Sequence, residues 1–441
     1  MKTWTPNHHH HHHHHHQQHY VLSLQILLLL LISASLFHSS SSLKIGETCS
    51  KDNDCDAGLR CETCAANGNT RPRCSRTQPI IPTSKVKGLA FNKYSWLTSH
   101  NAFAMSGTTK SATGSFLITG TNQEDSVSSQ LRLFTISIPR KMTSNGVRGL
   151  MLDMYDFENN IWLCHSFGGK CFNFTAFQPA INVLKEVQSF LQANPTEIIT
   201  IIIEDYVTSS KGLTKVFNAA GLSKFMFPLS RMPKDGSDWP TVDDMVQKNQ
   251  RLVVFTSMKS KEASEGIAYQ WNYMVENQYG DEGMIDGSCP NRGESPPMNT
   301  TTVSLVLMNY FPTNPNSTRA CSENSGPLIK MMNTCFQQDG RRWPNFIAVD
   351  YYQRNDGGGA SEAVDEANGH LTCGCDNIAY CKGNGTFGSC DVPILAPPPP
   401  AALSSSSPGG SSSTESNHAH KVLLRHWLYG SLVTSITYFI L

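Results

Sequence analysis

The stretch EIITIIIEDY, residues 197–206, is a run of apolar and β-branched residues that ends in two carboxylates. Such a run is typical of a strand that is buried on both faces of a parallel sheet. Six further segments are predicted to be strands. They are YSWLTS (94–99), GLMLDMY (149–155), IWLCHS (161–166), RLVVFTS (251–257), VSLVLMNY (303–310) and FIAVDYY (346–352).

Two segments between these strands have helical patterns. In residues 175–194 the apolar residues from Ile181 to Leu191 recur at helical spacing, and residues 357–371 are predicted to be a second helix. About 300 residues of alternating strand and helix indicate a (β/α) barrel. A doubly wound open sheet is the alternative, although neither of the fingerprints GxGxxG and GxxxxGK[ST] supports it.

Polar residues that can transfer protons or bind cations stand directly at the ends of several predicted strands. They are His100 with Asn101, Asp153, His165, Glu204 and Asp350. Active sites of (β/α) barrels lie at the carboxyl ends of the strands, so we expect these side chains to meet at one rim. Two histidines with carboxylates nearby favour general acid–base chemistry over purely structural hydrogen bonding.

Side-chain alternation separates two of the carboxylates from their neighbours. Asp153 shares a face with Met151, and Glu204 lies on the core-facing side of its strand, whereas Asp205 points the other way. A carboxylate on a core-facing side is costly to bury unless it is paired or binds a cation. Asp153 and Glu204 are therefore predicted to have such a partner, and Asp156 and Asp205 are expected to be capping or solvent residues.

Two residues near these motifs are expected to be structural. His370 lies inside the second predicted helix beside Cys373. Ser99 directly precedes His100, but no GxSxG elbow marks it as a nucleophile.

The chain has 14 cysteines, and five of them crowd the short polar segment 43–80, which must be stapled to fold. Five and nine are both odd, so complete pairing requires at least one disulfide between this module and the barrel, residues 85–393. Otherwise at least two thiols stay free. A zinc site in CETC (61–64) is not favoured, because no second CxxC pair stands at a suitable distance.

Both chain ends are predicted to be processing signals. Residues 1–42 hold a nine-histidine run and an apolar stretch of signal-peptide length. Residues 394–418 are a proline- and serine-rich linker, and residues 419–441 end in an apolar tail that is short for a transmembrane helix. Small residues upstream, Ser411 to Ser413, suit attachment of a GPI anchor, with a plain tail anchor or a secreted protein as alternatives.

These signals predict the secretory pathway and the cell surface, where an oxidising environment lets disulfides persist. Four N-glycosylation sequons agree with this location. They begin at Asn173, Asn299, Asn316 and Asn384. Lysine plus arginine equals aspartate plus glutamate at 35 each, so no net field favours nucleic acid as a partner.

Three segments resemble, in order and spacing, the X domain of phosphatidylinositol-specific phospholipases C (PI-PLC). They are TSHNAFA (98–104), GVRGLMLDMYDF with IWLCHSF (146–157 and 161–167), and EIITIIIEDY (197–206). The whole chain resembles the plant GPI-anchored proteins that contain such a domain. The resemblance implies an α/β fold, a distorted TIM-like (β/α) barrel, to which the small N-terminal disulfide-rich module is attached.

The resemblance also implies a phosphodiesterase that acts on an inositol phospholipid or a glycosyl-inositol lipid. In this family the inositol 2-hydroxyl attacks the phosphate, which releases diacylglycerol and a cyclic inositol phosphate. His100 matches the first family histidine, which acts as general base or stabilises the pentavalent phosphate, and His165 matches the general acid. Asp350 matches the aspartate that orients the first histidine in bacterial members. Imidazole suits both proton transfers because its pKa lies near the working pH.

Calcium is the cofactor that the resemblance implies. Asn101, Asp153 and Glu204 match three ligands of the eukaryotic members, and all three are the oxygen donors that calcium prefers. Met151 stands in the place of the fourth ligand, and a thioether is a poor one. Bacterial members use an arginine instead of the metal, at the position of Asp153; Arg148 is close in sequence but is not at that position.

Two other functions stay open. One is a catalytically weak or inactive barrel that acts as a surface binding protein, with the cysteine-rich module contacting a partner. The other is a glycerophosphodiester phosphodiesterase, whose first histidine is normally followed by arginine, whereas Asn101 stands here.

Overall fold

The computed structural model describes residues 42–391, except residues 57, 65–67, 69, 77, 133–144 and 384. The predicted leader, linker and anchor signal fall on the other residues, and so does the sequon at Asn384. Within the described part of the chain, no helix combines the length and the hydropathy needed to cross a membrane.

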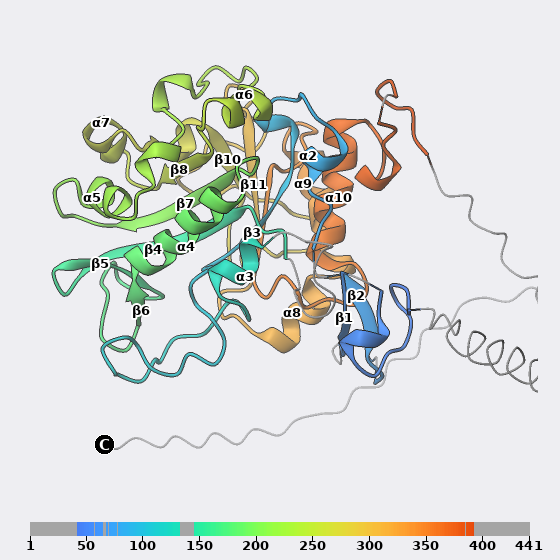
Figure 1. The fold of residues 1–441 in the computed structure, drawn as a ribbon, viewed down its shortest axis with the longest axis horizontal. Coiled ribbons are helices and arrows are strands. Elements are labelled where there is room, and N and C mark those ends of the chain that lie inside the picture. The colour runs from blue at the N-terminus through green and yellow to red at the C-terminus, as the bar shows by residue number, and fades with distance from the viewer. Residues whose placement is uncertain are drawn as a thin grey trace, which may run out of the picture. The chain divides into compact units, whose positions relative to one another are not determined.

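Eight strands, each parallel to its neighbours, form the centre of the fold (Figure 1). Their order is β10-β11-β12-β3-β4-β7-β8-β9, so they follow one another in chain order around the barrel. The bounds are β3 (Trp96–Ser99), β4 (Gly149–Phe157), β7 (Ile199–Tyr206), β8 (Leu252–Thr256), β9 (Ala268–Tyr269), β10 (Met274–Glu276), β11 (Leu305–Tyr310) and β12 (Phe346–Val349). In the described ranges β9 and β10 do not pair with each other, so the barrel is open there. The predicted distorted barrel is confirmed.

Side-chain alternation sorts the apolar residues into two cores. Trp96, Ile202 and Phe346 belong to an inner cluster that fills the barrel. Leu97 and Ile201, the neighbours of two of them in sequence, belong to an outer cluster that also includes residues of the covering helices. Burial on both sides explains why the central strands are continuously apolar.

The helices lie mostly between consecutive strands. They are α2 (Pro82–Lys85), α3 (Val127–Leu131), α4 (Ala180–Ala193), α5 (Gly212–Ala219), α6 (Val242–Gln247), α7 (Ser260–Glu265), α8 (Ser317–Glu323), α9 (Gly326–Gln338) and α10 (Gly359–Thr372). The predicted helix over 175–194 begins five residues later than expected, because residues 176–179 form strand β6 (Ala176–Pro179).

One predicted strand takes a place that the sequence pattern did not indicate. β5 (Asn160–Cys164) runs antiparallel to β4 and pairs on its other side with β6, so it lies outside the parallel path. The long strand β4 continues past the barrel and turns back through β5. His165 therefore follows a hairpin strand and not a strand of the barrel.

The cysteine-rich module is a small disulfide-bonded hairpin. Strands β1 (Leu59–Glu62) and β2 (Arg73–Arg76) pair antiparallel, and Cys49–Cys61 and Cys55–Cys74 staple the module internally. Cys64 bonds to Cys321 of α8, which is the bridge to the barrel that complete pairing requires. The other disulfides are Cys164–Cys171, Cys289–Cys335, Cys373–Cys381 and Cys375–Cys390.

Candidate active site

His100 stands at the carboxyl end of β3, held on two sides. Its Nδ1–H donates to Asp350 Oδ1 at 2.9 Å, and Asn122 Nδ2 donates to the same carboxylate oxygen at 2.9 Å. Its ring also stacks on Phe311, with ring centroids 3.6 Å apart. The bond to Asp350 fixes the proton on Nδ1 and turns Nε2 toward the inside of the rim.

Asn101 connects His100 to the carboxylates. Its backbone has a φ of 42°, in the left-handed region that asparagine tolerates, and its side chain is buried. With its nitrogen toward Asp153, the amide donates to the two carboxylate oxygens at 3.0 and 3.2 Å, and its oxygen lies 3.3 Å from His100 Nε2. In the opposite amide orientation, the Asn101 side-chain oxygen would lie beside the Asp153 carboxylate.

His165 reaches the rim from the β4–β5 hairpin. Its Nδ1–H donates to the carbonyl oxygen of Gly120 at 2.9 Å, which leaves Nε2 as the free ring nitrogen. The disulfide Cys164–Cys171 closes the loop that follows it. Burial lowers the pKa of His165 below 6.5; the Gly120 carbonyl opposes this shift, and the charge of His100 adds to it. The two histidines therefore lie within electrostatic range of each other.

Asp153 and Glu204 form a buried carboxylate pair. They are register partners on the adjacent strands β4 and β7, so their side chains point to the same side. Burial raises the pKa of Asp153 well above its ordinary value, the charge of Glu204 raises it further, and the charge of Arg292 opposes both effects. Tyr206 Oη donates to Glu204. Two carboxylates facing each other in this way favour a bound cation.

Arg292 and Glu276 belong to the same pocket, and the sequence patterns did not indicate either. Arg292 Nη1 lies 3.4 Å from Glu276 Oε1, and its guanidinium packs over Trp271 and Tyr279. Burial alone would lower the pKa of Arg292, but the charges of Glu276 and Glu204 outweigh it and raise that pKa. Arg292 thus brings a fixed positive charge to the carboxylate pair.

The pocket at these residues has the chemistry of a small cation site. Side chains from β4, β7 and β10 line it together with His100 and Arg292, and its free volume is about 20 Å³, close to the space of one water molecule or one monatomic ion. Asp153 and Glu204 supply hard oxygen donors that fit calcium, and Asn101 would supply a third only with its amide oxygen turned toward Asp153. Met151 also lines the pocket and supplies no oxygen.

Three residues are placed away from this chemistry. Arg148 is buried near the start of β4, where its Nε donates to Glu197 at 2.8 Å. Ser99 is fully buried and donates to Gln130 at 2.7 Å. His370 stacks on Trp343 with ring centroids 4.1 Å apart, in agreement with a structural role.

The expectation for Asp205 was wrong in part. Its side chain points away from Glu204, but it is buried and not in solvent. It accepts from Thr256 Oγ1 at 2.7 Å and from the Val207 backbone N–H at 2.9 Å. Asp156 does have a capping role, since it accepts from the backbone N–H groups of residues 208 and 209.

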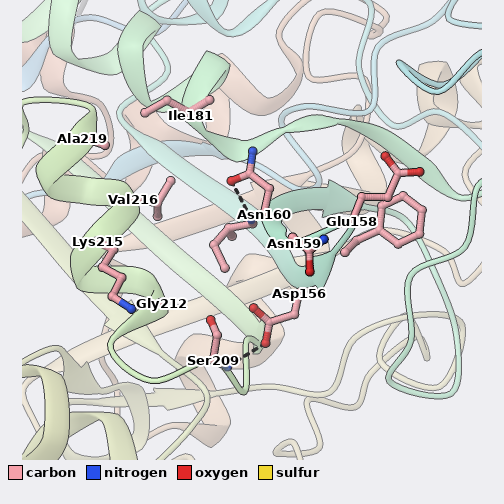
Figure 2. Close-up of a pocket in the computed structure, with 12 residues that line it drawn as sticks. Asp156, Glu158, Asn159, Asn160, Ile181, Ser209, Gly212, Lys215, Val216 and Ala219 are labelled. Atoms are coloured by element: carbon pink, nitrogen blue, oxygen red, sulfur yellow. Dashed lines mark hydrogen bonds between the residues drawn. The ribbon is translucent and has the colours of Figure 1, made fainter.

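A more open pocket of about 720 Å³ lies apart from these residues, between the β4–β5 turn and α5 (Figure 2). Figure 2 shows Asp156 hydrogen-bonded to Ser209, with Lys215 and Val216 of α5 on one wall and Ile181 of α4 on another. None of the predicted site residues lines it. Of its two carboxylates, Asp156 already accepts from backbone N–H groups, and Glu158 has no predicted site residue beside it in this pocket, so we assign the chemistry to the rim.

The comparisons with known proteins agree with this fold. The family model for the PI-PLC X domain (PI-PLC X 1) matches residues 102–365, which include Asp153, His165, Glu204 and Asp350. A PI-PLC X domain-containing protein of Arabidopsis thaliana is 54% identical over 352 residues, 80% of this chain and 80% of that protein. The chain belongs to the PI-PLC X domain family, as the resemblance predicted.

Solved structures of bacterial enzymes are similar at lower identity. A mutant of the phosphatidylinositol-specific phospholipase C of Staphylococcus aureus is 14% identical with a TM-score of 0.41, covering 64% of this chain and 96% of that chain. The enzyme of Listeria monocytogenes is 13% identical with a TM-score of 0.39, covering 63% and 94%.

Proposed function

We propose that this protein is a cell-surface phosphodiesterase of the PI-PLC type, which cleaves an inositol phospholipid or a glycosyl-inositol lipid. One observation carries the proposal. Two imidazoles are held through Nδ1, one by Asp350 and the other by Gly120, which leaves Nε2 of each ring outside these two contacts, and the charges of His100 and Glu204 both act on His165. Paired imidazoles of this kind can pass a proton in and out of a phosphodiester.

In the proposed reaction these two nitrogens transfer the protons. His100 Nε2 takes the proton of the inositol 2-hydroxyl, whose oxygen forms the new bond to phosphorus. His165 Nε2 gives a proton to the glycerol oxygen as its bond to phosphorus breaks, which releases diacylglycerol and a cyclic inositol phosphate. The attacking hydroxyl belongs to the substrate, so no serine or cysteine nucleophile is required.

Positive charge in the site comes from the chain itself and from the proposed metal. Arg292, which pairs with Glu276 and lines the pocket with Asp153 and Glu204, would supply one positive charge toward a phosphate at the rim. Calcium bound by Asn101, Asp153 and Glu204 would supply further positive charge against the phosphate.

Exposed apolar side chains beside His165 support a lipid substrate. Phe116, Ile118 and Phe167 have exposed fractions of 70%, 69% and 62%. Ile118 lies two residues before Gly120, and its backbone N–H donates to Phe174 in the loop after His165. Lys110 Nζ lies 5.0 Å above the Phe116 ring. Apolar side chains with a nearby lysine suit contact with an anionic lipid surface.

The test is release of water-soluble inositol phosphate from phosphatidylinositol vesicles by the purified ectodomain. We expect His100→Ala and His165→Ala each to lower the rate by about 10²–10⁴-fold, because each removes one proton transfer. His370→Ala is the matched control, and we expect it to keep the wild-type rate. If the wild-type protein and all three variants are equally inert across several inositol lipids, with and without calcium, the binding-protein alternative is favoured.

A further inference from the structure

The cysteine-rich module contacts the barrel through a compact network of charges. Arg60 Nη2 lies 3.1 Å from Glu62 Oε2 within the module, and Arg60 Nη1 lies 3.2 Å from Glu124 Oε2 of the barrel. Arg354 of the barrel closes the network: its Nε donates to Glu124 Oε1 at 2.7 Å, and it also pairs with Glu62. The Glu62 side chain is 4% exposed, so the network is largely shielded from water.

Glu124 belongs to the segment that holds both histidines. Within residues 120–124, the carbonyl of Gly120 accepts from His165 Nδ1, and Asn122 Nδ2 donates to the Asp350 oxygen that fixes His100. Gln123 Nε2 donates to the His100 backbone carbonyl at 2.7 Å. A shift of this segment would therefore move the partners of both imidazoles at once.

Arg354 lies on the second segment that orients His100. It follows Asp350 by four residues, and between them the Tyr351 backbone N–H donates to the Asn122 carbonyl at 2.7 Å. Tyr351 has a φ of 45°, outside the usual region for tyrosine, so its conformation depends on these surroundings. Glu124 and Arg354 thus tie the two segments to each other and to the module.

The disulfide of the module supplies a second attachment close by. Cys64 bonds to Cys321 in α8, beside β1 and β2 of the module (Figure 1). Asn324, at the end of the same helix, donates through Nδ2 to the backbone carbonyls of Asp350 at 2.8 Å and Tyr351 at 3.1 Å. The covalent bond and the ion network therefore hold the same segment from two directions.

We infer that the cysteine-rich module is a positioning device for the two histidines, acting through Glu124 as a positioning residue. This inference rests on the proposed function for its kinetic readout. A misplacement of about 1 Å in catalytic groups lowers rates by up to about a hundredfold, so a device of this kind has a measurable effect.

Two glutamates of the barrel allow a matched test, because each forms an ion pair with an arginine of the module. Glu124 pairs with Arg60 next to the histidine segments, whereas Glu362 pairs with Arg76 at 2.9 Å on α10. We expect Glu124→Gln to lower kcat by about ten- to a hundredfold with KM unchanged within about twofold. It should also shift the imidazole ¹H–¹⁵N resonances of His100 and His165. Glu362→Gln should leave kcat and these resonances at their wild-type values.

The outcomes separate this inference from the proposed function. Unchanged kcat and unchanged resonances in a folded Glu124→Gln protein would show that the module only stabilises the barrel. An inactive wild-type protein would overturn the proposed function, while the resonances would still decide whether Glu124 positions the imidazoles. If Glu124→Gln does not fold, Arg60→Gln repeats the test from the module side and leaves the Glu124–Arg354 pair in place.

Discussion

The two imidazoles have different surroundings, and a pH dependence follows from the difference. His165 is held by a backbone carbonyl, and burial lowers its pKa below 6.5. A general acid acts only when protonated, and the protonated form is lost as the pH rises through this lowered pKa. We therefore expect kcat/KM, which reports the free enzyme, to begin its fall on the alkaline side below pH 6.5. A fall that begins only above pH 6.5 would contradict the role of His165 as the acid.

Arg148 provides a prediction about stability that is separate from activity. Its side chain is 1% exposed, and its partner is Glu197. Removal of one member of a buried ion pair leaves the other charge without compensation, so Arg148→Met should lower the free energy of unfolding by about 3–5 kcal/mol. Denaturant titration measures the change.

The control for Arg148 is a residue whose ion pair faces water. Lys330 and Asp286 pair at 2.7 Å with side chains that are 64% and 72% exposed, so Lys330→Met should cost less than about 1 kcal/mol. Equal losses in the two variants would mean that the buried pair contributes no more than a surface pair. We expect the folded fraction of the Arg148 variant to keep the wild-type kcat.

Single residues at strand ends could be predicted because alternation fixes the side to which each one points. Asp153 and Glu204 lie where this reasoning placed them, facing each other. Glu276 could not be predicted, since β10 has only three residues and shows no period. Arg292 was also missed, because it comes from the loop between β10 and β11 and no sequence pattern relates that loop to the rim.

At the scale of elements, the loops on either side of His165 carry a prediction about lipid binding. The combined variant Phe116→Ser, Ile118→Ser, Phe167→Ser should weaken binding to phosphatidylinositol vesicles by at least about a hundredfold, since each buried apolar side chain contributes about 1.5–3 kcal/mol. Vesicle sedimentation measures the bound fraction.

Phe387 is the control for these loops. It is 72% exposed but lies in the disulfide-bonded segment after α10, so Phe387→Ser should bind vesicles as the wild type does. Equal binding by the combined variant and the wild type would contradict a lipid contact at His165.

All seven predicted strands are present, because long apolar runs identify buried strands with little ambiguity. The direction of a strand relative to its neighbours could not be predicted, because the same apolar run can form a parallel or an antiparallel strand. β5 illustrates this: its composition predicted a strand, but its short connection to β4 makes it a hairpin. β6 and β9, with four and two residues, are too short to show a period.

For the whole molecule, the proposed GPI anchor gives a prediction in cells. The full chain expressed in a eukaryotic cell should reach the surface, and a bacterial PI-PLC added outside should release it into the medium. Replacing Ser411, Ser412 and Ser413 by tryptophan should prevent surface attachment, because the signal requires small residues. Cell-surface labelling before and after the lipase measures the difference. Wild-type protein that is secreted without any lipase would contradict the anchor.

Because the module has an odd number of cysteines, complete pairing was predicted to require a disulfide between the module and the barrel, and this disulfide is present. The cysteine count alone could not identify the two residues that form it. Cys64 and Cys321 are 257 residues apart in sequence. A protease that cuts the chain at one place between them would leave two pieces joined by this bond. Non-reducing electrophoresis would then show one band, and a thiol would resolve it into two, so a nicked molecule could persist outside the cell without shedding a fragment.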